Sequence, residues 1–276
     1  GTFKFISNVN ARIVFQLNQF LIAAFLPINF VSFYAIPASL TQKVTSFLPN
    51  ITTPIFPLAS ELHSLSLKNK LIKLYKHSVK TVNLMIIPII SFLFFFSYPL
   101  LSLWIDPDFA NKASIVLKIL SIAYLLASFP AVPVTIIDGL NKPKIPAFFS
   151  TFSTIFYLFF AILLIPKHGI LGAALSVLLN RIIQVPIFIY FISNKILKIK
   201  SLSFYWHNYF KPIVMGVISA LPIIPLALKM KSLLQLSLAA TIYLSIYIFL
   251  CFVTKTIDKT DKYAIKKFIK PFLKRT

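Results

Sequence analysis

Long apolar stretches dominate this sequence and leave few folds open to it. A bilayer-spanning helix needs about 20 mainly apolar residues, and eight stretches approach that length, separated by polar or basic connections. Because an unpaired backbone group is costly in lipid, we predict an all-α, polytopic membrane helix bundle of about eight transmembrane helices. The predicted spans cover approximately residues 3–26, 31–60, 79–104, 112–137, 145–165, 170–194, 210–228 and 232–254.

The composition and charge support a membrane protein. Of 276 residues, 58% are hydrophobic and only 12% are charged, whereas soluble domains average about 25% charged residues. The formal net charge of +22 could indicate nucleic-acid binding in a soluble protein. Here most lysines lie between apolar stretches or in the tail, where membrane topology and anionic headgroups explain them better. We therefore expect anionic membrane lipids as partners, and no nucleic acid.

Every second connection is basic, which predicts an orientation in the membrane. Lysines gather between the second and third spans, the fourth and fifth, the sixth and seventh, and after the eighth. The positive-inside rule places these segments in the cytoplasm, together with both ends of the chain. We predict a multi-pass protein of the cell inner (cytoplasmic) membrane. Residues 61–80 and 258–276 are basic and amphipathic, so we expect interfacial helices there, although a partner-binding tail is the alternative for the second.

Three cations, Arg12, Lys43 and Arg181, lie near the middle of predicted spans, and no Asp or Glu lies at a matching depth. Such a charge costs about 2.5–3.5 kcal/mol on insertion scales, so it usually faces a polar cavity. We interpret these cations as lining a hydrated lumen that binds an anionic substrate group, for which the planar fork of arginine suits phosphate. Uncharged polar residues share the helical faces of these cations: Asn8, Gln16, Gln19, Asn50, Asn180 and Gln184.

Two other interpretations of these polar faces stay open. The uncharged residues could hydrogen-bond between spanning helices. An acid from an N-terminal part outside this chain could pair with one of the cations. The first of these needs no substrate, and the second needs no lumen.

No catalytic or metal-binding pattern emerges from the sequence. Asp106 and Asp108 flank Pro107 in a short connection, which favours a turn over a pair of catalytic carboxylates. Cys251 is the single cysteine, and the four histidines show no metal-ligand spacing. We therefore expect no enzyme activity, no metal and no cofactor.

Several segments resemble polysaccharide and O-antigen flippases of the multidrug, oligosaccharidyl-lipid and polysaccharide exporter superfamily. The similarity covers about residues 1–195 well and the last two spans loosely. The segments that carry it are FLPNITTPIFPLASEL (47–62), LKNKLIKLYKHSVK (67–80), LWIDPDFANKASIVLKIL (103–120), GLNKPKIP (139–146) and IPKHGILGAALSVLLNR (165–181).

The resemblance implies a fold of two helical lobes around a cationic lumen, with this chain as the C-terminal portion. Residues 1–194 would form the six-helix C-lobe, 195–254 two additional helices, and 255–276 a cytoplasmic tail. The chain opens with Gly1 rather than Met, and residue 3 already lies in a long predicted helix, so we expect the N-terminal lobe to be missing.

The resemblance also implies a function. Such a protein would translocate an undecaprenyl-diphosphate-linked oligosaccharide across the inner membrane by alternating access, driven by a proton or sodium gradient, with polysaccharide assembly machinery as a possible partner. The alternatives are a lipid II flippase, a small-molecule exporter of the same superfamily, and a membrane-embedded polysaccharide polymerase or glycosyltransferase. An exporter of cationic compounds would favour acids in its cavity, and this chain has cations there.

Overall fold

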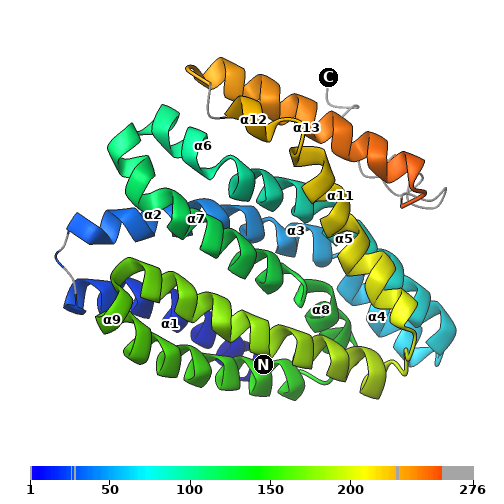
Figure 1. The fold of residues 1–276 in the computed structure, drawn as a ribbon. Coiled ribbons are helices and arrows are strands. Elements are labelled where there is room, and N and C mark those ends of the chain that lie inside the picture. The colour runs from blue at the N-terminus through cyan, green and yellow to red at the C-terminus, as the bar shows by residue number, and fades with distance from the viewer. Residues whose placement is uncertain (1, 26, 28, 228–229, 257–276) are drawn as a thin grey trace, which may run out of the picture.

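The computed structural model describes residues 2–25, 27, 29–227 and 230–256, and the regular elements of that part are all helices packed as a bundle (Figure 1). The predicted all-α polytopic bundle is therefore confirmed. The α-helices are α1 (Thr2–Phe25), α2 (Asn29–Ser46), α3 (Leu48–Thr52), α4 (Ile55–Ser64), α5 (Lys68–Phe95), α6 (Ser97–Trp104), α7 (Pro107–Ser128), α8 (Ala131–Gly139), α9 (Lys144–Tyr190), α10 (Leu202–Tyr205), α11 (Lys211–Ala220), α12 (Ile224–Ala227) and α13 (Leu233–Val253). Two short π-helices complete the set, η1 (Phe191–Ile196) and η2 (Trp206–Phe210).

Prolines divide several predicted spans into shorter helices. The second span is formed by α2, α3 and α4 in succession, with Pro49 at the start of α3 and Pro54 at the N-cap of α4. The fourth span bends between α7 and α8, where Pro130 is the N-cap residue. Proline lacks a backbone N–H and clashes with the preceding turn, so it begins helices readily and continues them poorly.

The long helix α9 is a hairpin of two arms that correspond to the fifth and sixth predicted spans (Figure 1). The chain reverses at Gly169, whose φ of 57° and ψ of −134° lie in a region that only glycine adopts readily. Just after the turn, a Cβ on Gly172 would lie 2.1 Å from the carbonyl oxygen of Leu164. The two arms therefore pack backbone against backbone at this end of the hairpin.

Side chains cap the first turns of α7 and α13, which both begin at the end of the bundle opposite the basic connections. Asp106 accepts a hydrogen bond of 2.7 Å from the backbone N–H of Phe109 at the start of α7. Ser232 accepts one of 3.3 Å from the N–H of Gln235 at the start of α13. Each satisfies one of the backbone donors that a helix leaves unpaired at its first turn. The predicted turn at Asp106 is thus a helix cap.

The outer surface of the bundle is strongly apolar. Four helical stretches are long and apolar enough to cross a membrane: Lys68–Phe95, Pro107–Gly139, Lys144–Ile196 and Leu233–Val253. In the most apolar window of the last of these, only 28% of the residues are buried, and Leu234 is 69% exposed. Because soluble proteins do not expose so large an apolar surface, this surface faces lipid. The chain is a multi-pass membrane protein, while eight crossings remain a prediction.

The basic connections gather at one end of the bundle, where α4 meets α5, α8 meets α9, η1 leads into α10, and α13 ends (Figure 1). One prediction for this end differs from the structure. Residues 61–80 do not form a separate helix, because 68–80 are the first half of α5 and continue into the third span without a break. The predicted tail helix, residues 258–276, lies outside the described residues.

Two large apolar clusters hold the bundle together. One joins α4, α5 and α8 to the end of α9 and to η1–η2, at the basic end. The other joins α1, α2 and α7 to both arms of α9, in the part that carries the predicted cationic residues. Its polar members are described next.

Candidate substrate-binding site

Arg181 lies on the second arm of α9, half-buried inside the bundle. Its Nε atom is buried and has no hydrogen-bond partner among the residues that the structure describes. A buried donor without a partner costs about 1–3 kcal/mol, and more when the group is charged. Water or a bound anion would satisfy this nitrogen.

The polar residues predicted to share the face of Arg181 are also inside the bundle. Asn180 is buried and joins the two arms of α9 through hydrogen bonds with Ser153, with Nδ2 to Oγ at 3.0 Å and Oγ to Oδ1 at 3.3 Å. For Asn180, the structure thus shows the alternative interpretation of the uncharged polar residues, a hydrogen bond between spanning helices. Gln184 lies one turn further along the arm, and its buried Oε1 has no partner. One member of the stripe is therefore structural, whereas two are left with unsatisfied atoms.

Three tyrosines in the apolar cluster next to Arg181 were not predicted. Tyr34 of α2 and Tyr157 of the first α9 arm are buried in the same cluster, with Tyr124 of α7 packed against them. The phenol of Tyr124 interacts electrostatically with the guanidinium of Arg181. The buried hydroxyl of Tyr157 has no hydrogen-bond partner. Arg181 and Gln184, one turn apart on α9, and Tyr157, which interacts with Tyr124, thus each have a polar atom that is unpaired among the described residues. Such atoms suit a polar, anionic group.

The other predicted site residues are not brought into this cluster by any contact that the structure describes. The side chains of Asn8, Arg12 and Gln19 on α1 lie outside the part of the chain that the structure describes. Gln16 on α1, Lys43 in the last turn of α2, and Asn50 on α3 are exposed. Their place in a lumen therefore stays a prediction. Lys118, half-buried on α7, is a further cation within a predicted span, and it was not predicted as a site residue.

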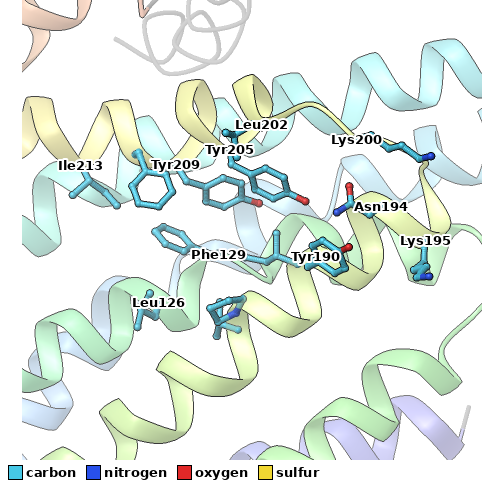
Figure 2. Close-up of a pocket in the computed structure, with 14 residues that line it drawn as sticks. Leu126, Phe129, Tyr190, Asn194, Lys195, Lys200, Leu202, Tyr205, Tyr209 and Ile213 are labelled. Atoms are coloured by element: carbon cyan, nitrogen blue, oxygen red, sulfur yellow. The ribbon is translucent and has the colours of Figure 1, made fainter.

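A pocket of about 860 Å³ lies between the end of α7, the second arm of α9, and the segment from η1 to α11 (Figure 2). Most of its wall is apolar, with Phe129 and Ile213 toward one end and Lys195 and Lys200 toward the other. This pocket was not predicted from the sequence, because its walls come from three separate predicted spans and a connection.

Polar groups lie at the middle of this pocket. The hydroxyls of Tyr205 and Tyr209 and the Oδ1 atom of Asn194 are buried, and the hydroxyl of Tyr205 lies near Asn194. Burial raises the pKa of Tyr205, so its phenol stays protonated at neutral pH and can donate a hydrogen bond. An apolar wall with hydroxyls and two lysines at one end matches an amphiphile that has a hydrocarbon chain and an anionic head.

Comparisons with known proteins identify the kind of protein that this chain resembles. Residues 1–109 match the family described as "Polysaccharide biosynthesis protein". A putative O-antigen transporter of Shigella flexneri is 25% identical over 180 residues, which cover 64% of this chain and 41% of that protein. The chain resembles membrane proteins of the polysaccharide flippase type. This confirms the resemblance predicted from the motifs.

A second relative extends the similarity over the whole chain. An uncharacterized membrane protein of Methanocaldococcus jannaschii is 26% identical over 281 residues, covering 100% of this chain and 53% of the relative. The chain thus spans about half the length of the curated relatives it matches. The flippase-type resemblance favours a transporter over an enzyme.

Proposed function

We propose that this chain forms part of a flippase that moves an undecaprenyl-diphosphate-linked oligosaccharide from the cytoplasmic to the outer leaflet of the inner membrane. The observation that carries the proposal is the set of Arg181, Gln184 and Tyr157, each with a buried polar atom that lacks a partner among the described residues. A diphosphate and its attached sugars are rich in hydrogen-bond acceptors and hydroxyls that could satisfy these atoms.

The geometry suggests how the cargo is recognised. The guanidinium of Arg181 would bind phosphate or sugar oxygens, and Tyr157 and Gln184 would bind sugar hydroxyls. Arg12 and Lys43 would add positive charge to the same passage from α1 and α2. Transport then requires alternation between two states of the bundle, for which a proton or sodium gradient would supply energy.

The amphiphilic pocket suggests where the cargo first binds. It lies toward the basic end, which the positive-inside rule places in the cytoplasm. Its apolar wall would accept the first isoprene units of the lipid, with the diphosphate near Lys195 and Lys200. The remaining lipid chain would stay in the bilayer.

Substitution of Arg181 tests the proposal. We expect Arg181→Ala to reduce surface polysaccharide at least tenfold in cells that depend on this protein, with an unchanged amount of protein in the membrane. Arg181→Lys keeps the charge but loses the two-pronged donor, so we expect an intermediate effect. Lys167→Ala removes an exposed cation from the same hairpin and serves as the matched control. Wild-type levels of polysaccharide with Arg181→Ala would contradict the proposed role.

The accumulating intermediate separates the alternative functions. A flippase defect leaves complete lipid-linked repeat units on the cytoplasmic leaflet. A polymerase defect leaves single units in the outer leaflet, and a lipid II flippase defect depletes peptidoglycan instead of surface polysaccharide. Loss of only small-molecule resistance would favour an exporter.

A further inference from the structure

A second pocket, of about 620 Å³, lies at the basic end of the bundle and is separate from the Arg181 cluster and from the amphiphilic pocket. Three segments that are far apart in the sequence form it. The first half of α5 contributes Lys73 and Lys76, the start of α11 contributes Lys211, and the segment after α13 contributes Lys255. No acidic residue is among the described residues that line it.

Like charges lie close together in this pocket. Lys73 and Lys76 are three residues apart on α5, where like charges repel each other across one helical turn. Lys211 donates a hydrogen bond of 2.6 Å to the carbonyl oxygen of Thr254, which leaves its ammonium two further hydrogens to donate. The bundle thus holds cations from three segments around one space.

Exposed apolar residues, which we call the apolar border, directly precede three residues that line the pocket. Trp206, Phe210 and Val253 come just before His207, Lys211 and Thr254, and are 53%, 57% and 61% exposed. In a membrane protein such side chains face hydrocarbon, whereas the neighbouring lysines reach the polar headgroup region. The pocket therefore lies where lipid tails meet lipid headgroups.

We propose that this pocket, which we call the lysine pocket, binds the phosphate headgroup of an anionic membrane lipid. Basic pockets between membrane helices on the cytoplasmic side suit such headgroups. The lysines would bind the phosphate oxygens by charge-assisted hydrogen bonds, and the acyl chains would lie along Trp206, Phe210 and Val253. A soluble phosphate would use the same cations but would gain nothing from the apolar border. The site does not depend on the proposed transport function.

Lipid binding by the purified full chain in a neutral detergent tests the proposal. Phosphatidylglycerol is the probe, phosphatidylcholine is the neutral comparison, and inorganic phosphate is the competitor. The variant K76Q/K255Q removes two exposed charges of the lysine pocket and spares Lys211, which holds the end of α13. K68Q/K70Q removes two exposed charges from the same helix outside the pocket and is the matched control. Monodisperse gel filtration of both variants verifies that they fold.

We expect wild-type protein to bind phosphatidylglycerol at least tenfold more tightly than phosphatidylcholine. K76Q/K255Q should lose about tenfold in that affinity, and K68Q/K70Q less than twofold. Equal losses in the two variants would overturn the proposal, because they would indicate attraction to overall charge. Displacement of phosphatidylglycerol by an equal concentration of inorganic phosphate would overturn it as well, since the apolar border would then contribute nothing.

Discussion

Replacing Gly172 with alanine would place a methyl group inside the tight turn between the two arms of α9. The new Cβ would lie 2.1 Å from the carbonyl oxygen and 2.5 Å from the carbonyl carbon of Leu164, where ordinary contacts are 3.4–4 Å. The arms would have to separate by more than an ångström. Inserting an extra methyl group into a packed core usually costs about 1–3 kcal/mol. Because the obstacle here is main chain, we expect about 3 kcal/mol, roughly a hundredfold change in the folding equilibrium.

Gly216→Ala is the matched control for this prediction. A Cβ there would meet side-chain atoms, Ser91 Oγ at 3.0 Å and Ile87 Cγ2 at 3.2 Å, which can move by a few tenths of an ångström. We expect it to cost less than about 1 kcal/mol. Thermal denaturation of the two detergent-solubilised variants, followed by gel filtration of the remaining monodisperse protein, measures the difference. Equal midpoints for Gly172→Ala and Gly216→Ala would refute the close backbone approach of the α9 arms.

Three further substitutions test other contacts. Asn83→Ala removes the buried hydrogen bond of 2.7 Å to the carbonyl oxygen of Asn208. It should lower the free energy of unfolding by about 1–3 kcal/mol. Asn69 is exposed on the same helix, so Asn69→Ala should change thermal stability little. Ser232→Ala removes the N-cap of α13 and should cost about 1 kcal/mol in the same assay, and no loss would contradict the cap. Ile213→Trp fills the amphiphilic pocket and should reduce surface polysaccharide. Val214 does not line the pocket, so Val214→Trp should leave surface polysaccharide unchanged. Equal effects of the two substitutions would contradict a role of the pocket in transport.

Local chemistry explains why most helices could be predicted from the sequence. Apolar stretches of membrane-spanning length mark the helices, and Pro49, Pro54, Pro130 and Gly169 mark where they bend or reverse. The separate helix at 61–80 was wrong for a physical reason. A basic amphipathic segment and the apolar segment after it have the same helical geometry. In the helix that begins at Lys68, no helix-breaking residue occurs before Pro88, which lies well inside the apolar segment.

The candidate site could be predicted only in part. The spacing of Asn180, Arg181 and Gln184 placed them on one face, and the structure places all three inside the bundle. Tyr34, Tyr124 and Tyr157 gave no signal, since tyrosines are also common as packing residues and come here from three helical segments. The two pockets depend on tertiary packing, because each joins segments that are far apart in the sequence. The amphiphilic pocket joins Leu126 to Ile213, and the lysine pocket joins Lys73 to Lys255.

The accessibility of position 181 to water tests the central claim most directly. In a Cys251→Ala background, Arg181→Cys can be labelled in intact membranes with a negatively charged, membrane-impermeant thiol reagent, and Ile182→Cys, exposed on the apolar surface, serves as the lipid-facing control. A hydrated passage for an anionic cargo predicts rapid labelling at 181, slow labelling at 182, and protection of 181 by added lipid-linked diphosphate oligosaccharide. Labelling of 181 as slow as that of 182 would contradict a water-filled passage at Arg181.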